Sequence, residues 1–181
     1  MSKALIAVLI VVLLSAAGLM FILDVKRRTD VCSEGRRICV YAGSGAVLAG
    51  DVKAVLERLD IPYYDVDEDF IKGGRLVECC TVLIVPGGYT ATYVSALGKD
   101  GFEKVREFIA GGGGYIGICA GAYIAARRVE VPGHPEGLGI INITNVRRSG
   151  VGLVNITIVK PDHSLAMRCP RVITIWYHTL Y

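Results

Sequence analysis

The chain has 181 residues and a mass of 19.4 kDa, with 52% hydrophobic residues and 20 basic against 17 acidic side chains. This composition excludes a disordered chain, a collagen-like repeat and a membrane protein with several spans. The net charge of +3 is small and evenly spread, so the chain lacks the basic patch of a nucleic-acid-binding protein. We therefore expect no nucleic-acid partner.

The first feature in chain order is an apolar run without charges, from Ala4 to Leu23. As a helix it would span about 30 Å, which is the thickness of the hydrocarbon core of a bilayer. We interpret residues 1–23 as a transmembrane anchor; the alternatives are a signal peptide, whose apolar part is usually shorter, and a buried helix. Three basic residues follow directly: Lys26, Arg27 and Arg28. By the positive-inside rule they place the following domain on the cytoplasmic side.

Six cysteines are spread along the chain without the paired spacing of a zinc site. The chain contains no glutamine, and depletion of thermolabile amides is typical of thermophile proteins, which can carry disulfides inside the cell. The number of cysteines therefore leaves the disulfide state and the compartment open. The acidic cluster at 65–69 has no histidine nearby, so we interpret it as a solvated loop and predict no metal site.

After a linker at 24–36, the sequence alternates short apolar strands with amphipathic helices. Strands are predicted at 38–41, 63–66, 81–85 and 115–118, and helices at 47–59, 102–110 and 120–129. Three β-rich runs follow near 139–147, 152–159 and 171–178. Near-continuous apolar strands between helices are typical of a parallel sheet covered on both faces. We predict one doubly wound α/β domain over residues 37–181, with a β-rich C-terminal part.

Ligands bind such sheets at the carboxyl ends of the strands, and three glycine-rich turns are expected there. These turns are Gly43–Gly45, Pro86–Tyr89 and Gly117–Gly121. None of them has the glycine spacing of a dinucleotide-binding turn or of a P-loop. We therefore predict no cofactor.

The third turn has the form glycine–x–nucleophile–x–glycine between a predicted strand and a predicted helix, which is the setting of a nucleophile elbow. Cys119 occupies the nucleophile position, and the two glycines remove side chains that would collide in so sharp a turn. The N–H of Ala120 is expected to point at the oxyanion of a tetrahedral intermediate. Gly87 or Gly88 of the neighbouring turn would supply a second donor. The alternative for Cys119 is a small buried core residue.

Three stretches of the chain together resemble a known family: YAGSG at 41–45, VPGGY at 85–89 and GGYIGICAGAY at 113–123. They are similar to the amidotransferase-like domain at the N-terminus of eukaryotic biotin–protein ligases, which belongs to the class I glutamine amidotransferase superfamily. The resemblance covers about 37–128 and implies a flavodoxin-like fold with Cys119 as the nucleophile. It does not imply biotin ligation, because the sequence does not contain the ligase catalytic domain. We assign Tyr89, beside the paired glycines, to substrate binding.

A cysteine amidase uses a histidine as its base, and the chain has three: His134, His163 and His178. The predicted elbow helix carries the chain too far from Cys119 for His134 to return, and His163 is predicted to lie in a turn. His178 lies in a predicted strand that could bring it to the site, so we select it as the base. The final run ends without a closing helix. We therefore also expect the chain to continue beyond Tyr181 into a segment that carries the missing base.

Taken together, these features favour a membrane-anchored glutamine amidotransferase-like domain that hydrolyses or transfers a small amide, with Cys119 and His178 as its catalytic residues. The alternative is an inactive module that binds or senses a small carboxylate or amide in the same place. The expected partners are that small molecule and, through residues 4–23, the membrane.

Overall fold

The computed structural model describes residues 35–129, 136–145 and 150–179. They belong to two compact units, one extending to Asn145 and the other beginning at Val146, and each is described by itself. The expected membrane anchor at 1–23 lies outside the described residues. Among the residues that are described, no helix is long and apolar enough to cross a membrane.

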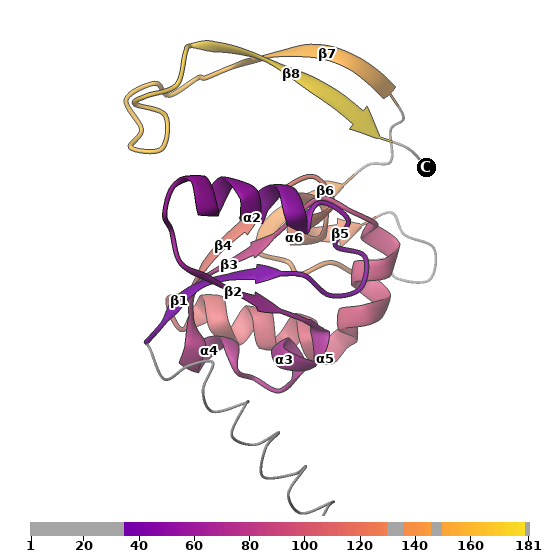
Figure 1. Cartoon of the computed structure of the whole chain (residues 1–181). Coiled ribbons are helices and arrows are strands. Elements are labelled where there is room, and N and C mark those ends of the chain that lie inside the picture. Colours follow the sequence, from indigo (N-terminus) through magenta and orange to yellow (C-terminus); the bar gives the residue numbers. More distant parts are fainter. Residues whose placement is uncertain (1–34, 130–135, 146–149, 180–181) are drawn as a thin grey trace, which may run out of the picture. The chain divides into compact units, whose positions relative to one another are not determined.

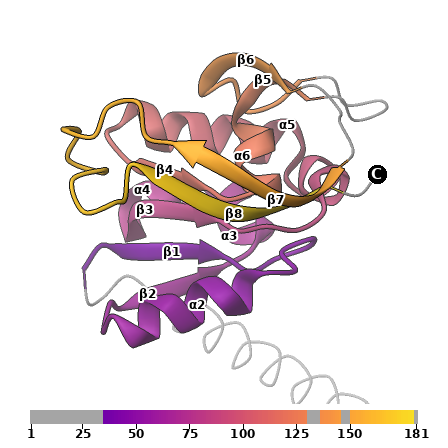
Figure 2. The same ribbon diagram turned by 90° about the horizontal axis from the view of Figure 1, so that it is seen from above.

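The first unit is built on a four-stranded parallel sheet with the order β2-β1-β3-β4, which can be followed in Figure 2. Its strands are β1 (Arg37–Tyr41), β2 (Tyr63–Val66), β3 (Cys80–Val85) and β4 (Gly114–Gly117). The chain starts in the middle of the sheet, winds outward to β2, and then returns past β1 to β3. This is the flavodoxin-like order, whose topological switch point lies between β1 and β3. The prediction of a doubly wound parallel sheet is confirmed.

Helices cover both faces of this sheet (Figure 1). One face carries α2 (Ala49–Arg58), and the other carries α3 (Glu68–Lys72), α4 (Leu76–Cys79) and α5 (Thr90–Ala110). The larger core lies on the α5 face, where Leu83, Tyr93 and Phe108 are at most 1% exposed. A smaller cluster lies beneath α2. There Leu56 of the helix is buried together with Val40 and Ile84 of the strands, whereas Val55 is 57% exposed.

Two helices differ from their predicted bounds. The helix predicted at 102–110 begins already at Thr90 and bends at Gly98, whose φ of 59° and ψ of −167° are not helical. The helix predicted at 120–129 is shorter, because α6 (Ala120–Ala125) ends where Ala126 turns to an extended conformation. Residues Ala126–Val129 form β5, which pairs in parallel with β6 (Ile141–Asn145). Strand pairing with a distant segment thus outweighs the local helical pattern.

The second unit is an antiparallel pair of strands, β7 (Gly150–Thr157) and β8 (Val172–Thr179). Their register runs without interruption from Gly150 opposite Thr179 to Thr157 opposite Val172. The β-rich runs predicted for the C-terminal part are confirmed, together with β6 in the first unit.

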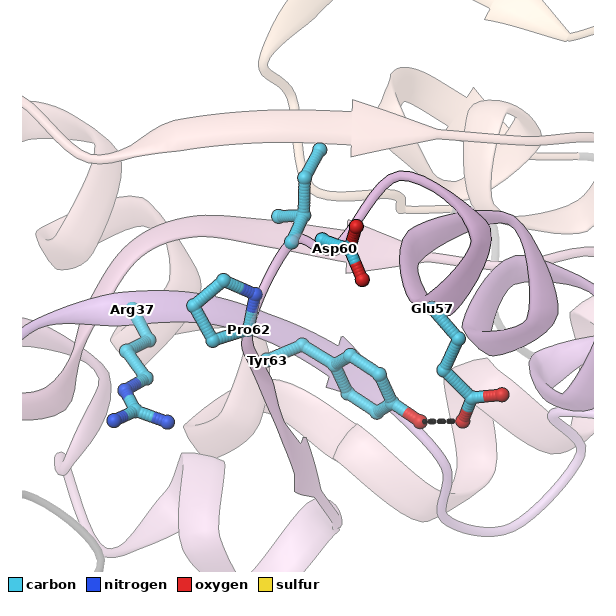
Figure 3. Close-up of a pocket in the computed structure, with 6 residues that line it drawn as sticks. Arg37, Glu57, Asp60, Pro62 and Tyr63 are labelled. Carbon is cyan, nitrogen blue, oxygen red and sulfur yellow. Dashed lines mark hydrogen bonds between the residues drawn. The ribbon is translucent and has the colours of Figure 1, made fainter.

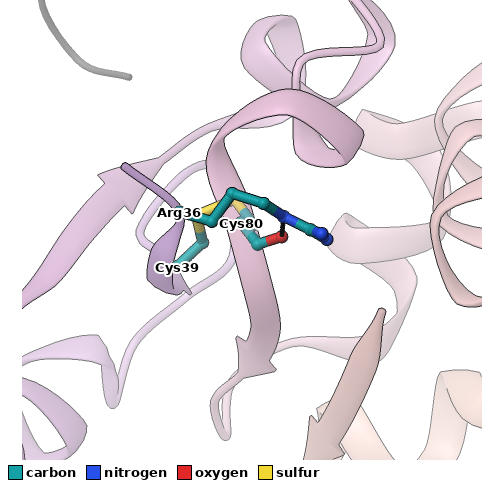
Figure 4. Close-up of a disulfide and its surroundings, with 3 residues drawn as sticks. All are labelled: Arg36, Cys39 and Cys80. Carbon is teal, nitrogen blue, oxygen red and sulfur yellow. Dashed lines mark hydrogen bonds between the residues drawn. A yellow bond between two sulfur atoms is a disulfide. The ribbon is translucent and has the colours of Figure 1, made fainter. Parts of the chain in front are cut away.

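A disulfide crosses the central sheet from β1 to β3 (Figure 4). It joins Cys39 and Cys80, both of which are fully buried. The side chain of Arg36 donates a hydrogen bond of 2.8 Å from Nε to the carbonyl of Cys80 at the same place. Cys119 and Cys169, by contrast, are free and exposed. The sequence left the disulfide state of the cysteines open. The structure assigns Cys39 and Cys80 to a disulfide and Cys119 and Cys169 to free thiols.

Candidate active site

Cys119 lies in a sharp turn between β4 and α6, at the carboxyl end of the parallel sheet. Its backbone has φ 51° and ψ −111°, a conformation that residues with side chains rarely adopt. Such strain is held by the surrounding structure and is concentrated at functional sites. Because the Cys119 side chain is exposed, this strained residue is presented to solvent rather than packed in the core.

The two glycines around Cys119 are required by close backbone contacts. A Cβ atom on Gly117 would lie 2.6 Å from the carbonyl oxygen of Gly121, and one on Gly121 would overlap the carbonyl oxygen of Val85. Hydrogen bonds fix the same turn. The N–H of Ile118 donates to Val85 O at 2.9 Å, and the hydroxyl of Tyr115 donates to Gly121 O at 2.7 Å. This is the architecture of a nucleophile elbow, in which crossing backbones leave no room for side chains.

The turn that follows β3, residues 86–89, lies directly beside Cys119 and is called here the oxyanion loop. A Cβ atom built on Gly87 would be 3.4 Å from the Cβ of Cys119. Within the described part of the chain, the N–H groups of Gly87 and Gly88 donate to no backbone carbonyl. Ala120 is the first residue of α6, so its N–H precedes the intrahelical hydrogen bonds. These three N–H groups are the candidate donors to an oxyanion.

Tyr89, which we assigned to substrate binding, is the last residue of the oxyanion loop. Its N–H is already engaged, donating 3.0 Å to the carbonyl oxygen of Gly45. Its side chain is 66% exposed. Tyr89 therefore ends the oxyanion loop with an exposed aromatic ring, while its backbone N–H holds the loop in place.

Two buried tyrosines support the oxyanion loop from beneath. The hydroxyl of Tyr93 donates 3.0 Å to the carbonyl of Pro86. Burial raises the pKa of Tyr93, and the electrostatic interaction with Cys119 raises it further, so this hydroxyl stays protonated beside the cysteine. The ring of Tyr41 packs edge-on against that of Tyr93, with centroids 5.4 Å apart.

The aspartates of the acidic cluster at 65–69 are exposed, as predicted, but the cluster forms the end of β2 and the start of α3 rather than a loop. Asp67 caps the first turn of α3, accepting a hydrogen bond of 2.8 Å from the N–H of Phe70. The carboxylate of Glu68 accepts from the hydroxyl of Ser44 at 2.5 Å, from the N–H of Ser44 at 3.1 Å and from the hydroxyl of Tyr41 at 3.1 Å. Desolvation opposes ionisation, but these hydrogen bonds prevail and lower the pKa of Glu68 to about 2.

The sequence contained one sign of this arrangement. An aspartate directly after a strand, with an apolar segment behind it, is a helix N-cap signal that predicts α3. The partner of Glu68 could not be found this way, because Ser44 is 24 residues away and meets it only through the pairing of β1 with β2.

The three histidines of the chain fall in different parts of the description. The described residues of the first unit include no histidine, and His134 lies outside the description. His163 lies in a turn of the second unit, as predicted, where its Nδ1 accepts 3.2 Å from the N–H of Leu165. His178 lies on β8 opposite Val151. We argued against His134 because a helix over 120–129 would carry the chain too far from Cys119. Since α6 ends at Ala125, that argument no longer holds.

A shallow hollow of about 580 Å³ lies elsewhere on the first unit (Figure 3). It is lined by Arg37 and Tyr63, the first residues of β1 and β2, and by the segment between α2 and β2. Tyr63 there donates 2.7 Å to Glu57. Because this hollow lies at the amino ends of the strands, it is at the opposite edge of the sheet from Cys119.

The parallel sheet, its switch point and the cysteine elbow define a class I glutamine amidotransferase-like domain. The chain belongs to the family of biotin–protein ligase N-terminal domains, whose sequence profile matches residues 36–142.

Two curated proteins illustrate the relationship. The pyridoxal 5'-phosphate synthase subunit PdxT of Koribacter versatilis is 40% identical over 108 residues, which cover 58% of this chain and 52% of that protein. The biotin–protein ligase of Schizosaccharomyces pombe is 35% identical over 99 residues, covering 51% of this chain and 16% of the ligase. The chain thus spans about half the length of the first relative.

Among solved structures, a peptidase E protein of Listeria monocytogenes matches with a TM-score of 0.50 and 20% identity, covering 59% of this chain and 63% of that one. At this identity the similarity shows the shared fold.

Proposed function

We propose that the first unit is a cysteine-dependent amidase or amidotransferase that acts on a small amide and forms a thioester at Cys119. The observation that supports it most is the strained, exposed Cys119 beside backbone N–H groups of the oxyanion loop. Membership of an amidotransferase-like family makes the side-chain amide of glutamine the first substrate to test.

The proposed reaction begins when the sulfur of Cys119 bonds to the carbonyl carbon of the amide. The carbonyl oxygen becomes an oxyanion, which accepts hydrogen bonds from the N–H of Ala120 and from Gly87 or Gly88. The carbon–nitrogen bond then breaks, and the nitrogen takes up a proton and leaves as ammonia or is passed to an acceptor. Water hydrolyses the remaining thioester to a carboxylate and restores the thiol. Removing one such preorganised donor typically costs a factor of about 100 to 1,000 in rate.

His178 remains our proposal for the group that moves the proton to the leaving nitrogen. Two observations support this choice. His178 lies in a strand, β8, whereas His163 lies in an exposed turn. His178→Ala should lower amide turnover by at least about a hundredfold, because a positioned acid–base group contributes at least that much. Acylation of Cys119 by an activated ester, whose leaving group needs no proton, should change far less.

Alkylation by a glutamine-analogue electrophile tests the nucleophile, because the chain contains a built-in reference. Cys169 is also free and exposed, but it has no elbow around it. In the full-length chain, the adduct should form at Cys119 at least about tenfold faster than at Cys169, and unfolding the chain should abolish the difference. Equal rates at the two cysteines in the native chain would contradict the proposal.

A second function is favoured by one observation, the lack of a histidine among the described residues of the first unit. On this alternative the same site binds a small carboxylate or amide without converting it. A thermal shift with glutamine or glutamate that survives Cys119→Ser, in a chain that releases no ammonia, would favour the binding module over the enzyme.

A further inference from the structure

We infer that Glu68 is a positioning residue for the oxyanion loop, acting through the turn that contains Ser44. This inference rests on the proposed function, since it concerns how the donors to the oxyanion are held. Glu68 is far from Cys119 in sequence and belongs to a different strand–helix connection, so no motif around the cysteine identifies it.

The carboxylate of Glu68 is committed to a single neighbouring turn. Among the described residues, Ser44 donates two hydrogen bonds to it, one from the backbone and one from the hydroxyl, and Tyr41 at the end of β1 donates another. All three partners are donors, which an ionised carboxylate matches better than an amide does. A Cβ atom on Gly43 would overlap the carboxylate, so the turn approaches Glu68 as closely as its backbone permits.

The turn that Glu68 holds is in contact with the oxyanion loop at several points. The carbonyl oxygen of Gly45 accepts the hydrogen bond from Tyr89 N–H, and the N–H of Leu48 donates 3.0 Å to the carbonyl oxygen of Gly87. A Cβ atom on Gly88 would overlap the same Gly45 oxygen. The two turns therefore fit together without spare room, and displacement of one displaces the other.

A second route leads from Glu68 to the loop through aromatic rings. Tyr41 donates to Glu68 and packs against Tyr93, and the hydroxyl of Tyr93 donates to the carbonyl of Pro86. Both tyrosine side chains are fully buried. The carboxylate thus fixes the orientation of Tyr41, which in turn confines the ring beneath the oxyanion loop.

This arrangement predicts a selective effect on chemistry. Releasing the Ser44 turn should shift the N–H groups of Gly87 and Gly88 from the place where an oxyanion forms. Acyl transfer depends on those groups, whereas alkylation of the sulfur by iodoacetamide forms no oxyanion. A loss of fold would change the rates of both reactions together. The ratio of the acylation rate to the alkylation rate therefore distinguishes a positioning role of Glu68 from a purely structural one.

The experiment compares the two reactions in the full-length chain carrying Cys169→Ser, so that Cys119 is the exposed free thiol that remains among the described residues. With p-nitrophenyl acetate, the Cys119 sulfur bonds to the acetyl carbon, the ester carbon–oxygen bond breaks, and p-nitrophenolate leaves while the thiol proton goes to solvent. The burst rate is measured against a Cys119→Ser blank. Iodoacetamide alkylation of Cys119 is followed by mass spectrometry.

Glu68→Ala should lower the acylation rate about tenfold, a fraction of what complete loss of a donor costs, with alkylation changed less than about twofold. Glu68→Gln keeps the shape and one acceptor oxygen, so it should lose about threefold in acylation. The matched control is Glu57→Gln, which weakens the hydrogen bond from Tyr63 to a carboxylate at the other edge of the sheet. It should leave both rates unchanged.

Unchanged acylation in Glu68→Ala would overturn the inference while leaving the proposed function intact. A parallel loss of both reactions in Glu68→Gln would make Glu68 a merely structural residue and would also overturn it. If the parent chain shows no burst that depends on Cys119, the proposed function fails and this inference fails with it. Failure of the proposed function would be seen in the parent chain, whereas failure of this inference alone would be seen in the Glu68 variants. The two outcomes are therefore distinguishable.

Discussion

The glycines of the elbow can be tested one residue at a time. Gly121→Ala should lower the free energy of unfolding by about 3 kcal/mol, because the new methyl group would overlap the carbonyl of Val85 in a tightly packed interior. Gly50 is the matched control, because a Cβ atom there meets nothing within 4 Å and the residue lies in α2. Gly50→Ala should raise stability by about 0.5 kcal/mol, since it only restricts the unfolded chain.

Urea unfolding followed by circular dichroism measures both changes in the full-length chain. Equal effects of the two substitutions would contradict the close contact between Gly121 and β3.

At the scale of single residues, the sequence was informative where spacing alone specifies geometry, as in the glycines on either side of Cys119. It was silent about Glu68, because a hydrogen bond to a residue 24 positions away depends on strand order. Local patterns contain no such information.

At the scale of elements, the disulfide between β1 and β3 joins two neighbouring strands of the sheet covalently. It closes a loop of 41 residues, and the chain-entropy relation assigns to such a cross-link about 4 kcal/mol of stabilisation. The double variant Cys39→Ala with Cys80→Ala should therefore unfold at a clearly lower urea concentration. Its far-UV spectrum should be retained, because both residues are small and buried in strands.

Peptide mapping of the unreduced wild-type protein checks the bond itself. Free thiols at both Cys39 and Cys80 would contradict the cross-link. Strand bounds were predicted well where an apolar strand leads into a turn with glycine or proline, as at β1 and β3. Helix bounds were missed at α5, whose first half precedes Gly98, and at α6, which gives way to β5. In both cases tertiary pairing or a single glycine decided the boundary, and helical periodicity did not.

At the scale of the whole molecule, the predicted anchor at 4–23 and the basic residues behind it set the expected orientation. If Lys26, Arg27 and Arg28 stay in the cytoplasm, a protease added to intact cells should leave the domain undigested. Permeabilised cells are the control, in which the same protease must cut it. Digestion without permeabilisation would contradict the cytoplasmic orientation and would accord with the usual occurrence of disulfides outside the cytoplasm.

The described contacts between the elbow and the oxyanion loop, and those that support the loop, join residues between Tyr41 and Gly121, a continuous stretch of the first unit. The proton-transferring histidine that we propose belongs to a separate unit. In evolutionary terms, a site divided in this way can pass on the part that receives developing negative charge as one block of sequence. Substitutions elsewhere can then replace or remove the proposed acid–base partner while the block persists. Descendants of one ancestor can therefore share the cysteine turn and differ in whether they turn over a substrate.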